Sequence, residues 1–466
     1  MSARVPENNF YRKLRETLDL HWLYETTKKY YGSEGQPSID PVVFFKLILI
    51  GYFENLGSDR RIINQVTLRM DLLYFIGYDI DEPLPWHSTL SRTRQLYGQE
   101  VFKQLFRDVL KQCIEKGMVA GARQAIDSVQ IKANASLDTL KEKEILEDGE
   151  LYAVNLKEED EQQPDNDDCS ANKWSNKTHY SSTDPDSRIA TKPGKTTDLK
   201  YLGQVSVDTA SHVITEVQIH HADRRDSQCL EKMVTGVTEN LQAEGLIVEQ
   251  VLSDSGYSST DALQCLQDND ITGYIPNHGR YKTERKGFTY DKENDCYVCG
   301  QGVQLRYTGI HVGNDGQPRK EYRSSARDCR NCPLRKQCIG KSSQKRIREL
   351  VNRHLFDNMH KRMQTKYGRT MMKLRQSTVE PVLGTLVNYL GMRRINTRGI
   401  EQADKGLLMA ATAYNLKKLL KFQAPKVNVI IKAMEKAHQI LNANLYLLFR
   451  VLGSLNRTNG KLVDQF

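Results

Sequence analysis

Long hydrophobic runs are missing from this sequence. Its most apolar stretch, residues 41–53, carries Lys46 and is too short to cross a bilayer. The first thirty residues mix charged and aromatic side chains and lack the apolar segment of a secretory signal. We therefore expect a cytoplasmic protein that has no membrane partner.

The sequence also lacks the signs of a disulfide framework. Its nine cysteines are an odd number, and five of them lie between residues 296 and 338. With no secretory signal in front of them, reduced thiols or a metal site are favoured over disulfides.

The composition is that of a globular protein with a basic balance. The chain has 466 residues, of which 39% are hydrophobic and 27% are charged. This length allows about two to four domains with cores of their own. The formal net charge of +9 favours polyanionic partners but does not prove one.

Residues 1–120 carry a helical pattern, because apolar side chains recur there at three- and four-residue steps. Pro83 and Pro85 end any preceding helix, and Ser88 is suited to cap a new one. We expect that helix to present polar side chains near its start, namely Thr89, Arg92 and Arg94.

The middle of the chain alternates between strand and helix signals. The expected strands are 123–134, 201–208, 212–220, 246–253 and 271–276, and the expected helices are 227–243 and 259–268. This order predicts an α/β fold with a mixed sheet covered by helices. Right-handed crossovers would place the first and fourth strands side by side.

Three acidic residues stand out against this pattern. Asp127 and Asp254 each end a short apolar run, and Glu380 lies far downstream, where we expect a helix to start. Neighbouring strands lie about 4.8 Å apart, so the two aspartates could share a metal ion. Carboxylates suit hard cations such as Mg²⁺, although most acidic residues of any protein are solvated surface groups. Asp208 also ends a strand, but the turn after it favours a role in a hairpin.

Two stretches of the chain carry a strong charge of one sign. The acid-rich residues 138–196 bury little apolar surface, and we expect a mobile insertion there. Residues 341–375 contain eleven Lys or Arg and only two acids, which is compatible with phosphate contact or with a solvated helical face. Helices are expected at about 381–392 and 402–422, followed by an amphipathic tail at 427–452.

The clustered cysteines form two Cys-x₂-Cys pairs. Cys296 with Cys299 and Cys329 with Cys332 supply the donors of a tetrahedral Zn²⁺ site, although the spacing between the pairs is longer than usual. A reduced, metal-free cluster is the alternative of similar weight.

The sequence resembles the DDE-type transposases of bacterial insertion sequences, in the branch with an InsH-like N-terminal domain. The resemblance rests on five segments in the order of that family: Leu68-Arg-Met-Asp-Leu-Leu-Tyr-Phe-Ile-Gly-Tyr-Asp, Pro85-Trp-His-Ser-Thr-Leu-Ser-Arg-Thr-Arg, Ile126-Asp-Ser-Val-Gln-Ile-Lys-Ala-Asn-Ala-Ser, Asp254-Ser-Gly-Tyr and Thr378-Val-Glu-Pro-Val-Leu-Gly. They extend over about residues 10–420.

The resemblance implies a function and a fold. It implies an RNase H-like core and a catalytic, metal-binding triad of Asp127, Asp254 and Glu380, which would hold two Mg²⁺ or Mn²⁺ ions. The enzyme would cut DNA at the terminal inverted repeats of its element, join it to target DNA, and act as a homodimer in the synaptic complex. It would be cytoplasmic and associated with the nucleoid.

The resemblance also suggests DNA contacts and a domain plan. The expected DNA contacts are Ser88, Thr89, Arg92, Arg94, Lys132 and Arg375. The helix expected from Ser88 to Arg94 would act as a helix-turn-helix reader, with an ordinary capped helix as the alternative. The expected parts are a helical N-terminal domain (1–120), a first part of the core (121–279), a cysteine-rich insertion (280–345), a second part of the core (346–422) and a helical tail (423–466).

One departure from the family pattern keeps other functions open. The family often has a basic residue seven positions after the glutamate, where this chain has Val387. A catalytically inactive DNA-binding protein, decayed or domesticated, is therefore one alternative. An RNase H-like nuclease that does not join DNA is the other.

Overall fold

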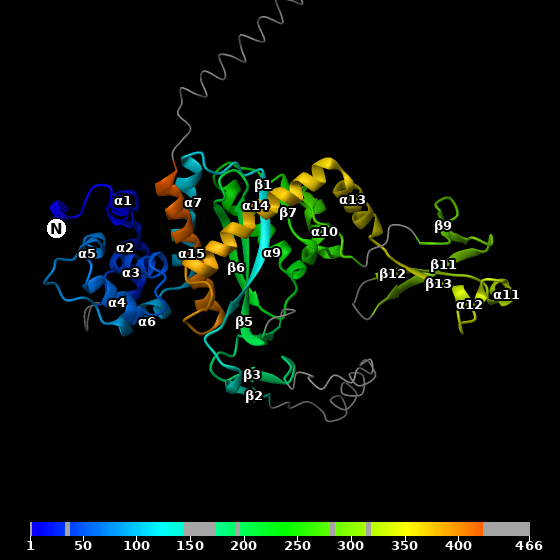
Figure 1. The fold of residues 1–466 in the computed structure, drawn as a ribbon, viewed down its shortest axis with the longest axis horizontal. Coiled ribbons are helices and arrows are strands. Elements are labelled where there is room, and N and C mark those ends of the chain that lie inside the picture. Colours follow the sequence, from blue (N-terminus) through cyan, green and yellow to red (C-terminus); the bar gives the residue numbers. More distant parts are fainter. Residues whose placement is uncertain are drawn as a thin grey trace, which may run out of the picture.

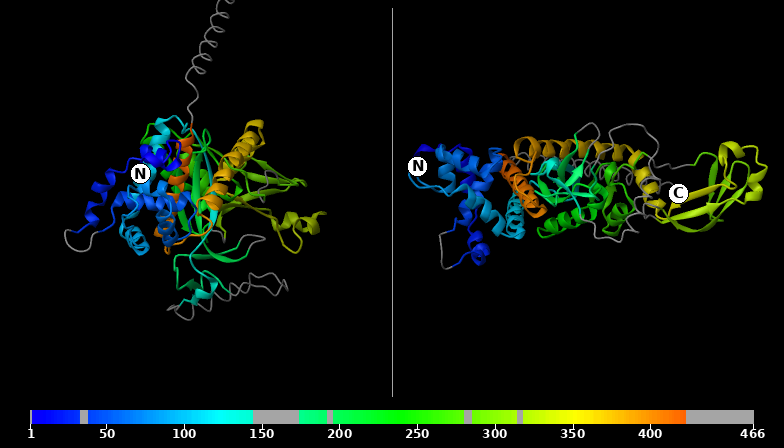
Figure 2. Two further views of the ribbon diagram at one scale, coloured as in Figure 1. Left: turned by 60° about the vertical axis from the view of Figure 1, so that its left-hand side comes forward. Right: turned by 90° about the horizontal axis from the view of Figure 1, so that it is seen from below.

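The structure is a computed structural model that describes residues 2–32, 38–143, 174–191, 196–279, 285–313 and 318–422. Figure 1 shows three parts in a row, which are a group of helices at the N-terminus, a central mixed sheet covered by helices, and a second sheet at the far end. The two further views of Figure 2 show the same elongated arrangement.

All the elements described before residue 123 are helical. A long apolar helix, α3, lies at the centre of this part, and Asp40 caps it by accepting hydrogen bonds from the backbone N–H groups of Val42 and Val43. Pro41 occupies its first position, where a missing N–H costs nothing. The elements are η1 (Ser2–Arg4), α1 (Phe10–Thr17), α2 (Trp22–Thr27), η2 (Lys28–Tyr30), α3 (Pro41–Phe53), α4 (Asp59–Thr67), α5 (Met70–Ile76), α6 (His87–Leu96) and α7 (Gln99–Glu115).

The central sheet is mixed. Its strands are β1 (Arg123–Lys132), β4 (Arg188–Ala190), β5 (Asp198–Asp208), β6 (Ile214–His221), β7 (Gln250–Leu252) and β8 (Thr272–Tyr274). β5 pairs antiparallel with β1, β4 and β6, while β1, β7 and β8 run parallel in that order. The prediction that the first and fourth expected strands are neighbours in a mixed sheet is confirmed, because Ala125 of β1 pairs with Leu252 of β7. The fourth strand is shorter than the expected 246–253.

Helices cover both faces of this sheet. On one face, α15 (Ile400–Lys421) packs on β5 and β6, and α14 (Lys366–Tyr389) crosses β1, β5, β7 and β8 (Figure 1). The close approach of α15 depends on Gly203 of β5, where an added Cβ would lie 3.3 Å from Leu407 and 3.1 Å from Ile131. The other helical segments are η4 (Asp226–Gln228), α9 (Leu230–Gln242), η5 (Ser255–Tyr257), α10 (Thr260–Asp268) and α13 (Arg353–Gln364).

The expectation for the helix that carries Glu380 is wrong. Glu380 was expected at a helix start, but α14 begins at Lys366 and runs through it to Tyr389, with Pro381 inside the helix. A proline lacks the N–H that a helix interior needs, which is why the sequence suggested a boundary at this point. The helix dipole therefore does not favour a charge on Glu380, because that effect is confined to the terminal turns.

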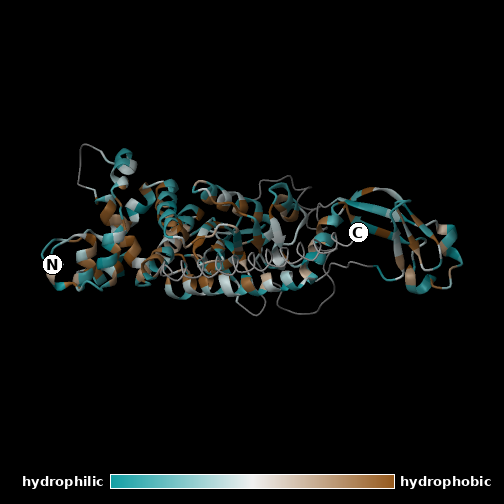
Figure 3. Ribbon diagram, turned by 90° about the horizontal axis from the view of Figure 1, so that it is seen from above, coloured by the Kyte–Doolittle hydropathy of each residue, from teal (hydrophilic) through white to brown (hydrophobic). Residues whose placement is uncertain are grey.

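The second sheet, which we call the distal sheet, is antiparallel and has the order β13-β12-β11-β10-β9. It contains β9 (Phe288–Asp291), β10 (Cys296–Cys299), β11 (Gln304–Val312), β12 (Pro318–Arg323) and β13 (Arg346–Leu350), with α11 (Ala326–Arg330) and α12 (Arg335–Cys338) before the last strand. Its sheet thus extends five residues past the boundary expected at residue 345. Long hydrophilic stretches mark its strands in Figure 3.

The two sheets have separate hydrophobic cores. One continuous cluster joins the N-terminal helices to the central sheet, whereas the distal sheet has a small cluster of its own made by Tyr297, Leu305, Tyr322 and Ile347. The distal sheet therefore depends more on polar interactions than the rest of the molecule.

The acid-rich stretch is described only at its two ends. η3 (Leu137–Thr139) leads into β2 (Leu140–Glu142), which pairs with β3 (His179–Ser181). Residues 144–173, on which most of the predicted mobile insertion falls, and the predicted tail 423–466 lie outside the described residues. Within the described part of the chain, none of the helices is both long enough and apolar enough to cross a membrane.

Candidate active site

Asp127 and Asp254 lie at the same level of the central sheet. Ala125 and Leu252 form the last pair between β1 and β7, and each aspartate follows its strand's member of this pair by two residues. Asp254 caps the short helix η5 by accepting a hydrogen bond of 2.8 Å from the N–H of Gly256. Two strands that run side by side thus bring to one place carboxylates that are more than a hundred residues apart in sequence.

Arg375 links Asp127 to Glu380. Its Nη1 lies 2.8 Å from Oδ2 of Asp127, and its Nη2 lies 3.7 Å from Oε1 of Glu380. The side chains of Arg375 and Asp127 are only 11% and 17% exposed, whereas that of Glu380 is 57% exposed. Arg375, one of the expected DNA contacts, thus lies as a counter-ion beside two of the carboxylates, and its contact with DNA stays a prediction.

The surroundings of Asp127 disfavour its negative charge. Burial raises the pKa of the Asp127 carboxyl, and the nearby charge of Asp254 raises it further. The N–H of Ser128, at 2.8 Å, and the Arg375 guanidinium oppose this shift without cancelling it. A cation that reached this site would relieve the repulsion between the two aspartates.

The three predicted carboxylates are suitable ligands for a hard cation, but their side chains are not grouped as a metal site in this structure. Carboxylate oxygens are the ligands that Mg²⁺ and Mn²⁺ prefer. Across the described residues, however, no three His, Cys, Asp or Glu side chains are grouped so that they could hold a metal ion. In this conformation the guanidinium of Arg375 lies between two members of the predicted triad.

The sequence analysis did not predict a buried hydrogen-bond network next to Asp254. The hydroxyl of Tyr257 donates to Gln204 of β5, whose Nε2 donates in turn to Asp226 at 3.0 Å. Burial raises the pKa of Tyr257, and so do the charges of Asp226, Asp127 and Asp254. Gln204 gave no signal in sequence, because only strand pairing brings it next to this turn.

The residues of helix α6 that were expected to contact DNA differ in their exposure. Ser88 and Arg92 are exposed, whereas Arg94 is turned inward and forms a bidentate ion pair with Asp59 at 2.6 and 3.0 Å. Ser88 is not the cap of this helix, since the capping position is Trp86 and no side-chain capping bond is made there. DNA contact by Ser88, Thr89 and Arg92 stays a prediction.

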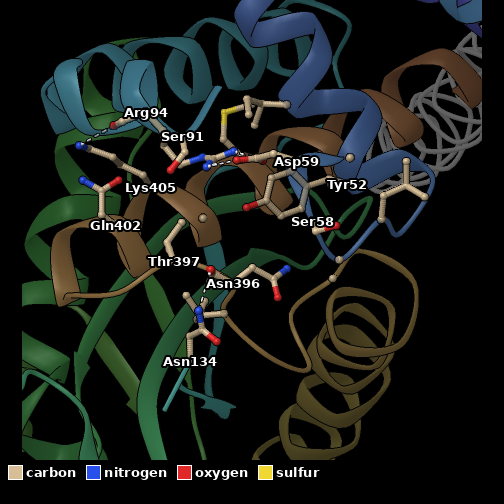
Figure 4. A pocket seen from close by; sticks show the side chains of 18 of the residues that line it. Tyr52, Ser58, Asp59, Ser91, Arg94, Asn134, Asn396, Thr397, Gln402 and Lys405 are labelled. Carbon is tan, nitrogen blue, oxygen red and sulfur yellow. Dashed lines mark hydrogen bonds and ion pairs between the residues drawn. The ribbon is translucent and has the colours of Figure 1, made fainter. Parts of the chain in front are cut away.

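The pair made by Arg94 is part of a cavity of about 650 Å³ between the N-terminal helices and the central part (Figure 4). Lys405, which is fully buried, reaches into it, donates to the backbone carbonyl of Arg94 at 3.3 Å and pairs with Glu401 at 2.8 Å. The cavity includes none of the three predicted catalytic carboxylates. Because Arg94 and Lys405 are both held in ion pairs, we assign these two residues a structural role.

Lys132, another expected DNA contact, lies at the end of β1. Its ammonium group pairs with Asp198 at 2.7 Å, and 43% of the side chain is exposed. DNA contact by Lys132 stays a prediction, because such a half-exposed pair is weak and can be exchanged for a phosphate.

The distal sheet separates the cysteines that were expected to bind zinc. Cys296 and Cys299 are three residues apart on β10, so their side chains point to opposite faces. A small cavity of about 30 Å³ is lined by Cys299, Cys329, Cys332 and Cys338, but not by Cys296. The predicted set of four is therefore unsupported, and no cysteine group in the described ranges is arranged to hold a metal ion.

Two family models match the chain. Residues 1–96 match a transposase domain (DUF772), and residues 298–420 match a transposase DDE domain. The resemblance to DDE-type transposases is thereby confirmed at both ends of the described chain. The second match includes Arg375 and Glu380.

Solved structures add little to this result. The "Mos1 transposase paired-end complex with left transposon end" is 10% identical, with coverage of 60% of this chain and 75% of that chain and a TM-score of 0.17. The "Mos1 mariner paired end complex with Mn" is 9% identical, with coverage of 58% and 73% and a TM-score of 0.16. Scores this low carry no argument. No curated protein matches the sequence.

Proposed function

We propose that this protein is a transposase that binds the ends of an insertion sequence, cuts DNA strands with the help of divalent metal ions, and joins the freed 3′ ends to target DNA. The two matches to transposase domains support the general assignment. The strand order of the central sheet is compatible with the RNase H-like fold that the resemblance implies.

One observation carries the proposal of catalysis. Arg375 contacts two of the three predicted carboxylates, Asp127 within β1 and Glu380 within α14. The charge of the third, Asp254 after β7, acts on Asp127. Excess negative charge in a partly buried place is costly unless a cation offsets it. A single arginine leaves part of that charge unmatched, which favours a further cationic partner.

In this proposal the three carboxylates hold Mg²⁺ or Mn²⁺. The bound ions would activate a water molecule or a 3′ hydroxyl group and stabilise the leaving oxygen. The chain itself would supply the positions of the carboxylates and, through Arg375, a positive charge that keeps them together before the ions bind. Tyr257 and Gln204 would hold the turn that carries Asp254.

The test is the substitution Asp127→Asn in the full-length protein. We expect Mg²⁺-dependent nicking of duplex DNA to fall by at least about 1000-fold, because metal coordination supplies several kcal/mol of transition-state stabilisation. Binding of the same duplex should stay within about twofold. Asp261→Asn, an exposed site on α10, is the matched control. Unchanged nicking by Asp127→Asn would exclude the assignment of Asp127.

Two other functions fit particular observations. The counter-ion Arg375 and the uncharged Val387 favour a DNA-binding protein that has lost catalysis, and such a protein would bind duplex DNA without nicking it. A nuclease of the same fold would nick DNA but would not join it. Incubation with a 3′-hydroxyl end and a supercoiled plasmid separates the latter from a transposase.

A further inference from the structure

The distal sheet carries a local excess of positive charge. Residues 285–350 contain fifteen Lys or Arg and seven Asp or Glu, whereas the whole chain has 67 and 58. This one seventh of the sequence thus has a net charge of +8, the difference between fifteen and seven. A charge collected in this way indicates a local partner rather than general solubility.

Three arginines form a row across this sheet. Strand pairing places Arg306 of β11 opposite Arg323 of β12, and Arg323 opposite Arg346 of β13. Residues paired in this way share one face, and neighbouring strands are about 4.8 Å apart. We call these three residues the arginine row. Like charges directly opposite each other destabilise a sheet, so the row does not serve stability.

A single buried carboxylate offsets part of this charge. Glu321 on β12, with a side chain only 4% exposed, pairs with Arg348 at 2.6 Å, with Arg346 at 3.9 Å and with Arg323. These contacts hold the pKa of Glu321 below its usual value although burial opposes them. Arg323, Arg346 and Arg348 still keep 38–47% of their side chains exposed.

Arg306 is left without a partner in this arrangement. It is exposed, and within the described residues it forms no ion pair. Glu321 therefore pairs with three arginines and leaves Arg306 unmatched, so the row keeps an excess of positive charge. An anion from outside the chain could therefore bind to this face of the distal sheet.

We propose that the arginine row binds the phosphate backbone of duplex DNA. The planar guanidinium group donates in parallel to two phosphate oxygens, and regularly spaced arginines can follow successive phosphates. Glu321 holds two members of the row, Arg323 and Arg346, through its ion pairs. This inference rests on the proposed function, because DNA is the polyanion on which a transposase acts. It assigns the distal sheet a part in DNA binding that is independent of metal binding.

The experiment measures binding of a duplex of arbitrary sequence by the full-length protein at several salt concentrations. The variant combines Arg306→Gln with Arg346→Gln and leaves Arg323 and Arg348 to pair with Glu321. If both arginines contact phosphates, the slope of log Kobs against log salt should become shallower by about 2, since each contact contributes about 0.9. Affinity in low salt should fall by about tenfold.

A matched control removes the same charge elsewhere in the distal sheet. Lys286→Gln with Lys292→Gln takes two exposed cations from the β9 hairpin. We expect a slope close to that of the wild type. An equal change in the control would overturn the proposal, because net charge and not the row would then govern binding.

Stability provides a second readout. Removal of Arg306 and Arg346 relieves repulsion, so the melting temperature should stay the same or rise. A marked fall in melting temperature would mean that the row is structural and would contradict the proposal. If the wild type binds no duplex at all, the proposed function fails. If it binds but the row variant has the wild-type slope, only this inference fails.

Discussion

The candidate active site has an excess of negative charge, whereas the distal sheet has an excess of positive charge. In the first, one arginine, Arg375, lies among the carboxylates of Asp127 and Glu380. In the second, one carboxylate, Glu321, lies among several arginines. Both arrangements are held by a single counter-ion and both leave charge unmatched. Because the unmatched charge is negative at the first site and positive at the second, we expect a metal cation at the first and a polyanion at the second.

The strongest way to break this comparison is the substitution Arg375→Gln. It leaves Asp127 buried beside Asp254 without its counter-ion, and loss of one partner of such a pair costs about 4 kcal/mol. We expect urea unfolding without metal to show a loss of this size, and added Mg²⁺ to restore more stability to the variant than to the wild type. Lys373→Gln, exposed on the same helix, is the control. Equal stability of Arg375→Gln and the wild type would remove Arg375 from the site.

Glu216 provides a third case, a buried carboxylate that has no arginine partner. Glu216 accepts hydrogen bonds from Asn240 at 2.5 Å and from Gln218 at 3.3 Å, and burial raises its pKa to about 7. The folded protein then binds more protons than the unfolded chain, so this group's contribution to stability declines as pH rises from about 4.3 to about 7. Glu216→Gln should abolish that decline.

The expected gain of Glu216→Gln over the wild type is near zero at pH 4 and grows to as much as about 3 kcal/mol at pH 8. Chemical unfolding across this pH range measures it. Glu231→Gln, at an exposed position of α9, should follow the wild type. A gain that does not depend on pH would refute the assignment of the raised pKa to Glu216.

The smallest effect is expected for Glu321→Gln. It removes the anion that pairs with Arg323, Arg346 and Arg348, but these arginine side chains are partly exposed, so the cost is reduced to about 2 kcal/mol. Hydrogen exchange in β12 and β13 should become faster, and added phosphate should slow it again. Because the pKa of Glu321 is lowered, its stabilising effect should be present above about pH 4.3 and disappear as pH falls further. Glu293→Gln, on the exposed β9 turn, should change neither measure.

Local patterns predicted the elements of the central sheet well. The apolar runs that end near Asp127 and Asp254 became neighbouring parallel strands, because right-handed crossover leaves few other arrangements. The same reasoning misplaced the helix that carries Glu380, since a proline usually marks a helix boundary and here lies inside α14. The zinc prediction rested on spacing alone and ignored that Cys296 and Cys299 face opposite ways on a strand.

The sequence by itself determined the kinds of elements, the positions of the acids and the excess of positive charge, because periodicity and composition are local properties. Only the tertiary structure decided that Arg375 is a counter-ion, that Gln204 supports Tyr257 and that three arginines stand in one row. Those relations depend on the register between strands and on helix packing. They join residues that are far apart in the chain, and no local pattern encodes them.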